Sequence, residues 1–278
     1  MSDQPLPEKI RRRFKVNTVG EMWRKYLTEG TIRTKQYRRF YGSLPSNPRC
    51  VICQKPFAGI GGNLLRILTG VHKSTKNPRF CAGCHSFTSR FPGGAEIKLT
   101  MLFVDVRGST TIAEKMNNTE FSQLMNRFYE AAIDTLIQSY AFIDKLVGDE
   151  VTALFIPGYA GKDHARKAVE AGKALLQVTG YGTSDGPWVP IGVGVHTGTA
   201  WVGSIVGASG TGADFTALGD NVNIAARLAS KAGAGEVLVS DAAYNASGLD
   251  LGNLEQRQLE LKGKSEPTSV RVLRVSGG

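Results

Sequence analysis

Residues 99–111 read LTMLFVDVRGSTT and combine a buried strand with an acidic strand end. The apolar run predicts a strand covered on both faces, because a half-exposed strand would alternate apolar and polar residues. Asp105 follows this run, and a glycine and three hydroxyl residues come soon after it. A carboxylate in this position can hold a divalent cation beside phosphates, or it can simply cap the next helix. A second acidic stretch, KLVGDE at 145–150, lies between two strand-like segments and favours the cation site.

The segments that follow alternate between helical and strand periods. Apolar residues at helical spacing predict helices at 118–140, 163–178 and 220–230, with Asp163 as the N-cap of the second. Strands are predicted at 142–147 and 151–156 as a hairpin, at 188–203 with a turn at Thr197-Gly198, and at 236–240, 254–261 and 268–275. The resulting order, βαββαβ, predicts an α+β fold of the ferredoxin-like type.

The length and composition are those of a globular protein. At 278 residues the chain has room for one large or two smaller domains, and its 41% hydrophobic and 21% charged residues are ordinary. No apolar run approaches the roughly 20 residues that span a bilayer, and the beginning lacks the apolar core of a signal peptide. We therefore expect a cytoplasmic protein.

The charge is divided unevenly along the chain. The formal net charge is +10, yet residues 1–100 hold 19 Lys and Arg against 5 Asp and Glu, and the remainder is slightly acidic. Such a division indicates modules with different partners. The sequence therefore predicts a basic segment at 1–49, a cysteine-containing module at 50–88, a linker at 89–96 and a larger domain at 97–278.

The basic segment mixes cationic residues, such as Arg11, Arg12 and Arg13, with aromatic residues such as Trp23. Residues 21–26 are expected to begin a short amphipathic helix. The composition predicts an anionic partner, which could be a membrane surface, an acidic protein or nucleic acid. It fits equally a helix that packs on its own protein, and no motif that reads nucleic acid accompanies the charge.

The four cysteines occur in two CxxC pairs, Cys50 with Cys53 and Cys81 with Cys84. Each pair places two thiolates on one turn, and four thiolates complete the tetrahedron that zinc prefers. Zinc is therefore the expected metal, and an iron–sulfur cluster is its main rival. Four unligated buried thiols are the simplest alternative.

Five motifs together resemble one known family. The stretches MLFVDVRGST, KLVGDE, GVGVHTGTAWVGSIVG, FTALGDNVNIAARL and LELKGKSEP occur in the order and spacing of class III nucleotidyl cyclases. Residues 97–275 are similar to a bacterial adenylyl cyclase catalytic domain. The cysteine-containing module lies outside the resemblance.

The resemblance implies a reaction in which the ribose 3′-hydroxyl attacks the α-phosphate in line and pyrophosphate leaves. It implies two Mg²⁺ or Mn²⁺ ions per active site, held by Asp105, Asp149 and the backbone carbonyl of Val106. By the same likeness Asn223 orients the ribose, and Arg227 stabilises the transition state through its permanently charged guanidinium. Asn223 and Arg227 are four residues apart, so they share one face of the predicted helix.

Other positions concern the base and the triphosphate. Lys145 matches the residue that donates to adenine N1 in adenylyl cyclases, whereas guanine carries a hydrogen on that atom. Thr216 stands where many animal adenylyl cyclases have an aspartate, and its hydroxyl can accept the same hydrogen bond from the adenine amino group. Lys262 is similar to the family's triphosphate-binding lysine, although neighbouring Lys264 competes for this assignment. His196 is taken as structural.

These observations predict an adenylyl cyclase that converts ATP to cyclic AMP and works as a homodimer with shared active sites. The nearest alternative is a cyclase for GTP or a pyrimidine nucleotide. Alternatives from other classes are a non-catalytic, cyclase-like regulatory module that binds nucleotide, and a zinc-dependent nucleic-acid binder with a vestigial cyclase domain. The presence of both aspartates and of the Asn–Arg pair favours an active enzyme.

Overall fold

The computed structural model describes residues 4–30, 32–44, 49–70, 72–75, 79–206, 213–263 and 266–275. Contacts divide the chain into two compact units. Unit 1 is formed by Met1–Ile97, Ile156–Gly161 and Ala200–Leu218, and unit 2 by Lys98–Phe155, Lys162–Thr199 and Gly219–Gly278. In the part of the chain that is described, no helix is long and apolar enough to cross a membrane.

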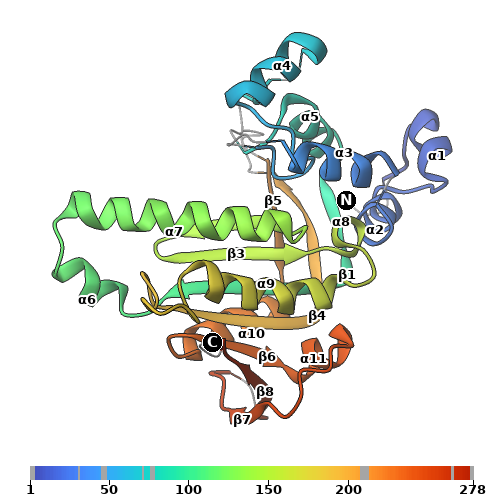
Figure 1. Ribbon diagram of the computed structural model, residues 1–278. Coiled ribbons are helices and arrows are strands. Elements are labelled where there is room, and N and C mark those ends of the chain that lie inside the picture. Colours follow the sequence, from blue (N-terminus) through green and yellow to red (C-terminus); the bar gives the residue numbers. More distant parts are fainter. Residues whose placement is uncertain are drawn as a thin grey trace. The chain divides into compact units, whose positions relative to one another are not determined.

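Two strands, β1 (Gly93–Val106) and β4 (Ile191–Val206), run through both units (Figure 1). The other elements of unit 2 are α6 (Ser109–Glu114), α7 (Asn118–Gln138), β2 (Phe142–Val147), β3 (Glu150–Phe155), α9 (His164–Val178), α10 (Asp220–Lys231), β6 (Glu236–Ser240), α11 (Asp241–Ser247), β7 (Glu255–Leu259) and β8 (Thr268–Leu273). Their strands form one sheet in the order β2-β3-β1-β4-β6-β8-β7. β1 pairs antiparallel with β3, and β4 pairs parallel with β6.

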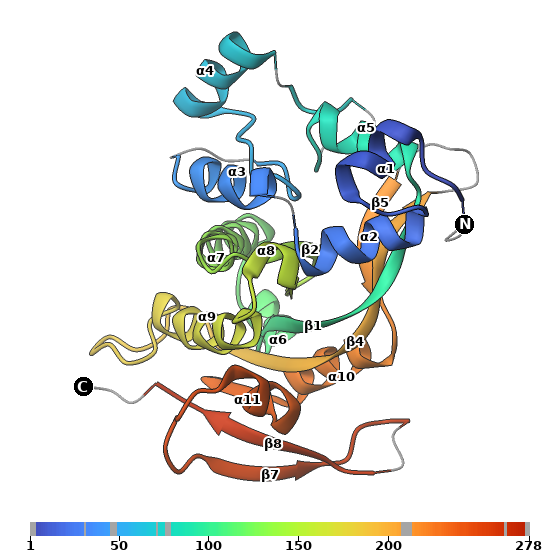
Figure 2. The ribbon, with the colours of Figure 1, turned by 90° about the vertical axis from the view of Figure 1, so that its right-hand side faces the viewer.

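Helices cover both faces of this sheet (Figure 2). Val193 and Gly194 are neighbours on β4, so they point to opposite faces. On one face Gly172 of α9 lies so close that an added Cβ would be 2.9 Å from Val237 and 3.6 Å from Val193. On the other face a Cβ at Gly194 would lie 2.3 Å from the backbone nitrogen of Ala229 in α10. α9 and α10 therefore pack on opposite faces, and both contacts depend on the small size of glycine.

The predicted α+β fold is confirmed, and its hairpin lies where it was expected. β2 ends at Val147 and β3 begins at Glu150, so two residues form the turn. Gly148 supplies the left-handed conformation that such a turn needs, with φ of 62°. Local turn chemistry was sufficient to predict this hairpin.

Of two further local predictions, the turn at Thr197-Gly198 was wrong and the N-cap at Asp163 was confirmed in position. Thr197 and Gly198 form no turn, because β4 continues through them to Val206. Gly198 is small for a packing reason, since a Cβ there would lie 2.3 Å from the side chain of Asn221. Asp163 occupies the N-cap position of α9, but its side chain makes no capping hydrogen bond and pairs with Lys167 instead.

Regular structure also extends into the predicted linker at 89–96, because α5 (Ala82–Arg90) ends inside it and β1 begins inside it. A strand that the sequence did not predict, β5 (Ala213–Leu218), pairs antiparallel with β4 in unit 1. The domain boundaries themselves stay a prediction.

Unit 1 contains short helices, strand β5 and parts of β1 and β4, and aromatic rings contribute to its core. The remaining helices are α1 (Glu8–Phe14), α2 (Val19–Thr28), α3 (Ile32–Gly42), α4 (Gly59–Thr69) and α8 (Pro157–Ala160). α2 begins with a capping box between Thr18 and Glu21, which explains why a helix starts there. Trp23 of α2 is fully buried, and its indole nitrogen donates to the carbonyl of Phe91 (3.0 Å). Tyr26 and Tyr41 are also buried, so aromatic residues of the basic segment build a core.

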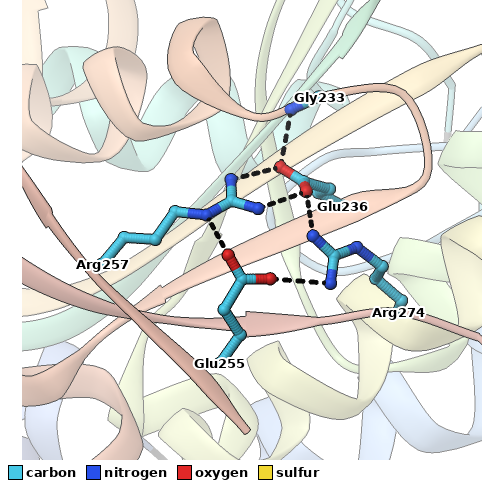
Figure 3. Close-up of polar contacts among 5 residues, drawn as sticks. All are labelled: Gly233, Glu236, Glu255, Arg257 and Arg274. Carbon is cyan, nitrogen blue, oxygen red and sulfur yellow. Dashed lines mark hydrogen bonds and ion pairs between the residues drawn. The ribbon is translucent and has the colours of Figure 1, made fainter.

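A carboxylate in unit 2 joins the end of α10 to the edge of the sheet (Figure 3). Glu236, on β6, accepts hydrogen bonds from the backbone nitrogen of Gly233 and from Arg257 and Arg274. Glu255 completes the group by pairing with both arginines. Mainly because Arg257 donates to it, Glu236 has a pKa of about 2, below the ordinary 4.5. The network fixes the loop between α10 and β6 against β7.

We predict that Glu236→Gln lowers the free energy of unfolding by about 2–3 kcal/mol at pH 7, because two arginines lose a mostly buried anion. The pKa is lower in the folded state, so the stabilisation is complete above the ordinary pKa of 4.5 and is lost as pH falls toward about 2. Urea unfolding of the wild type and the variant at pH 7 and pH 3 measures this. Glu130→Gln, at an exposed site on α7, is the control. The prediction is contradicted if the free energy of unfolding differs between the wild type and Glu236→Gln by the same amount at pH 7 and at pH 3.

Candidate functional site

Three carboxylates gather where β1 ends. Asp105, near the end of β1, lies opposite Glu150 in the β1–β3 ladder. The backbone nitrogen of Val106 donates to the carbonyl of Asp149, the second residue of the β2–β3 turn (3.2 Å). Antiparallel pairing and a two-residue turn thus bring together Asp105 and Asp149, which are far apart in the sequence. Both residues are partly exposed at this end of the sheet.

Burial and charge repulsion act together on Asp105 and Glu150. Burial raises the pKa of Asp105, Arg107 opposes this rise, and Asp149 adds to it. The pKa of Glu150 is also raised, first by burial and then by Asp105. A cation bound between the carboxylates would relieve this repulsion. Carboxylate oxygens and a backbone carbonyl are the ligands that Mg²⁺ and Mn²⁺ prefer, so the donor set fits such ions.

Arg107 is a charged residue of this region that the sequence analysis missed. Its guanidinium forms an ion pair with Asp105 and donates to the carbonyl of Ser230, near the end of α10 (3.0 Å). Its backbone nitrogen donates to the carbonyl of Pro190 (2.8 Å). The sequence does show an arginine two positions after the strand-end aspartate. That spacing alone could not reveal the contact between Arg107 and Ser230.

A second group of polar residues lies on α10 and at the β7–β8 connection. Asn223 is exposed and Arg227 is half-buried one turn later, while Ile224 between them points into the core. An ideal Cβ at Gly263 would be 3.8 Å from the guanidinium of Arg227, so this cation lies beside the connection that carries Lys262. Lys262 is exposed there.

Two of the predicted basic residues, Arg227 and Lys262, thus lie in neighbouring parts of unit 2. Lys231 and Lys262 line one cavity together with Glu260 and Glu266, so its lining carries charges of both signs, and Arg227 is not part of that lining. Lys264 lies outside the described residues. The structure brings Arg227 and Lys262 together. Arg227 is not among the charges that shift the pKa of Asp105.

The two predicted base-contacting residues fall in different units. Lys145 is exposed on β2, opposite Thr152 of β3 in unit 2. Thr216 is buried on β5, opposite Gly203 of β4 in unit 1. His196 is buried in unit 2 and hydrogen-bonds to the side chains of Ser240 (2.8 Å) and Asn221 (2.9 Å). These contacts agree with a structural role for His196.

The four cysteines form a compact cluster in unit 1. All four Sγ atoms lie within 4.8 Å of one another, and those of Cys53 and Cys81 are 3.7 Å apart. Cys84 is half-buried, and the other three are buried. Hydrogen bonds among the thiols lower the pKa of Cys81 and raise that of Cys53. The structure therefore brings together the two CxxC pairs, as the spacing predicted.

Comparison with known proteins adds independent information. Residues 95–273 match the family model described as the adenylate and guanylate cyclase catalytic domain. An adenylate cyclase of Anabaena cylindrica is 27% identical over 192 residues, which are 62% of this chain. The aligned part is 36% of that relative, so the chain corresponds to about a third of its length.

Two solved structures share the fold. The guanylyl cyclase Cya2 has a TM-score of 0.57 and 27% identity, covering 66% of this chain and 95% of its own. The adenylyl cyclase CyaB from P. aeruginosa has a TM-score of 0.56 and 30% identity, covering 64% of this chain and 94% of its own. These similarities leave the choice of base open between adenine and guanine.

Proposed function

Because the chain belongs to the adenylate and guanylate cyclase catalytic domain family, we propose that it is an adenylyl cyclase that converts ATP to 3′,5′-cyclic AMP and pyrophosphate. The observation that carries the proposal is the meeting of Asp105 and Asp149 at one end of the sheet. Two carboxylates near one point supply the donor set for divalent ions that act on a phosphate substrate.

The two carboxylates have the first role in the mechanism. Asp105, Asp149 and the carbonyl of Val106 would hold Mg²⁺ or Mn²⁺, and when bound these ions would acidify the ribose 3′-hydroxyl and neutralise phosphate charge. Asp105 and Asp149 thereby fix the part of the site where the attacking oxygen and the α-phosphate meet. Burial of Asp105 strengthens its interaction with charged groups.

The residues of α10 and the β7–β8 connection act on the substrate directly. Asn223 hydrogen-bonds to the ribose and orients its 3′-oxygen for in-line attack. Arg227 donates to the oxygens of the α-phosphate as negative charge develops there, and Lys262 binds the β- and γ-phosphates, which leave as pyrophosphate. The closeness of Arg227 to Gly263 supports a joint action of these two cations.

The base is assigned from Lys145 and Thr216. The ammonium group of Lys145 is a donor, which suits the unprotonated N1 of adenine and opposes the N1–H of guanine. Thr216 accepts a hydrogen bond from the adenine amino group. The guanylyl cyclase Cya2 has a slightly higher TM-score to this chain than the adenylyl cyclase CyaB and a slightly lower sequence identity, so GTP is the second candidate substrate.

The proposal includes a homodimer, a second metal site and an anionic partner. The four clustered cysteines are proposed to hold zinc, with an iron–sulfur cluster as the alternative. The exposed residues Arg11, Arg12, Arg24 and Arg39 are available to a membrane surface, an acidic protein or nucleic acid. We expect the reaction to take place in the cytoplasm, where ATP is abundant.

Turnover of single nucleotides tests the proposed reaction. Purified protein with Mn²⁺ or Mg²⁺ is given ATP, GTP, CTP or UTP, and the products are separated by chromatography. We expect cyclic AMP as the main product, and Asp105→Asn should abolish it because the ions lose a ligand. A non-catalytic regulatory module would bind nucleotide without forming any cyclic product, and that outcome would contradict the proposal.

Replacing Lys145 with Glu tests the choice of base. We predict that Lys145→Glu changes the ATP-to-GTP preference in favour of GTP, because an acceptor then faces the base. One mispaired buried contact is worth roughly 1–3 kcal/mol, so kcat/KM for ATP relative to GTP should fall about 5- to 150-fold. Lys173→Glu, at an exposed site on α9, makes the same charge change as a control. An unaltered preference in Lys145→Glu means that this residue does not read the base.

Mixing two inactive variants tests whether each site is shared between two chains. If one chain supplies Asp105 and Asp149 and the other supplies Asn223 and Arg227, a mixed dimer of Asp105→Asn and Arg227→Ala has one intact site. Random exchange makes half of the dimers mixed, so about a quarter of the wild-type activity should return.

The matched control mixes Asp105→Asn with Asp149→Asn. In the shared-site model one chain supplies both aspartates to a given site. Each site of a mixed dimer then lacks either Asp105 or Asp149, so no site is intact and activity should stay absent. Equal rescue in both mixtures, or none in either when subunit exchange is demonstrated, contradicts a shared site.

A further inference from the structure

We propose that Cys50, Cys53, Cys81 and Cys84 bind one Zn²⁺ ion and that this ion holds helix α5 against strand β5, which carries Thr216. The metal would then be a structural support for the part of the chain that is proposed to contact the base. Only the link to the base rests on the proposed adenylyl cyclase function. The metal site and its support of β5 stand on the geometry of unit 1.

The sulfur positions favour a single ion. With Zn–S bonds of about 2.3 Å, a tetrahedral site places its sulfur atoms roughly 3.8 Å apart. The Sγ atoms of Cys53 and Cys81 are 3.7 Å apart, and all four lie within 4.8 Å of one another. An iron–sulfur cluster distributes its four thiolates over several irons and needs wider spacing. The observed spacing therefore selects zinc from the two candidates.

The backbone around both CxxC pairs is arranged to present thiolates. After the first pair, Gln54 adopts the left-handed conformation, with φ of 63°, and its nitrogen donates to the carbonyl of Cys50 (2.8 Å), which closes the turn. Cys81 is the N-cap of α5, and the nitrogen of Cys84 donates to its Sγ (3.4 Å). An N–H donor and a helix N-terminus both stabilise a thiolate.

Hydrogen bonds that do not involve the sulfur atoms connect the two CxxC pairs, and a buried arginine balances the negative charge of their thiolates. The nitrogen of Val51, inside the first pair, donates to the carbonyl of Arg79, which precedes the second pair (3.0 Å). The guanidinium of Arg38 is 3% exposed and donates to the carbonyls of Val51 (3.3 Å) and Ile52 (2.8 Å). Zinc with four thiolates carries net negative charge, and a buried guanidinium beside it stabilises that charge.

The same segment contacts β5. Arg79, two residues before Cys81, forms an ion pair with Asp214 on β5 (3.0 Å). The same carboxylate oxygen of Asp214 accepts a hydrogen bond from the nitrogen of Phe215 (3.0 Å), the residue before Thr216. A metal ion that fixes Cys81 therefore fixes Arg79 and, through it, the beginning of β5.

Aromatic packing forms a second link between α5 and β5. The ring centroid of Phe87, on α5, lies 5.5 Å from that of Trp23, which in turn lies 5.7 Å from that of Phe215. Trp23 and Phe215 are fully buried. Cys81 and Cys84 anchor the first turn of α5. Release of the metal would therefore free the N-terminal end of α5, the helix whose Phe87 contacts Trp23.

Metal analysis of the full-length chain tests the first part of the proposal. Protein purified without chelator should contain about one zinc and no iron per chain. Cys81→Ser should lose most of the zinc, whereas Asp214→Asn should keep it because that change leaves all four thiolates in place. Iron in place of zinc, neither metal, or undiminished zinc in Cys81→Ser overturns the proposed site.

Hydrogen exchange of the backbone amides tests the support of β5. After zinc is removed from the wild type by a chelator, the amides of residues 214–218 should exchange about tenfold faster, because local opening becomes easier. Residues 101–104 of β1, in unit 2, should keep their exchange rates and serve as the internal control. Asp214→Asn should also speed exchange in β5 while zinc remains bound.

Chelation needs no substitution, so the experiment does not depend on whether Cys81→Ser folds. Unaltered exchange in β5 after complete zinc removal overturns the link between the metal and the strand. Neither measurement uses turnover, so a chain that cyclises no nucleotide can still show both effects. A cyclase that lacks zinc would instead refute this inference and leave the proposed conversion of ATP to cyclic AMP intact.

Discussion

The partial burial of neighbouring carboxylates at the end of the β1–β3 ladder is the constraint on which the candidate active site depends. Antiparallel pairing places Asp105 opposite Glu150, and the short turn adds Asp149 to the same end. Burial first and neighbouring negative charge second raise the pKa of Asp105 and of Glu150, and Arg107 pairs with Asp105 as a counter-charge. Since Arg107 also contacts the carbonyl of Ser230, the charge balance of the carboxylates is tied to the end of α10. A cation that binds Asp105 must therefore compete with Arg107.

α10 is held from several sides, which gives its polar face a defined position. Gly194 lets the helix approach β4 closely, and Leu228 packs with core residues of β6 and β8. The Glu236 network fixes the loop that follows the helix. Asn223 and Arg227 are then left on the outer side, where a substrate can reach them. Rigid support of this kind would hold the proposed catalytic side chains in a fixed geometry.

A feature of the fold or of the candidate site could be predicted from the sequence when residues close together in the chain determine it. The hairpin at Gly148 and the start of α2 at Thr18 follow from turn and capping chemistry that a few residues contain. The meeting of the CxxC pairs followed from ligand spacing. By contrast, the role of Gly198 depends on Asn221, and the contact between Arg107 and Ser230 joins residues that no local pattern relates. Strand β5 was missed because its pairing with β4 is visible only once both strands are in place.

The continuity of β1 and β4 through both compact units has an evolutionary consequence. Domains that are joined by a linker can be exchanged by recombination as intact pieces. Here the match to the family begins at residue 95, yet unit 1 includes Ala200–Leu218 from the middle of that match. Within unit 1 the ring of Phe215 packs on Trp23, which lies before the match begins. Transfer of the family domain alone would leave Phe215 without this cover, so the two parts are expected to be inherited together.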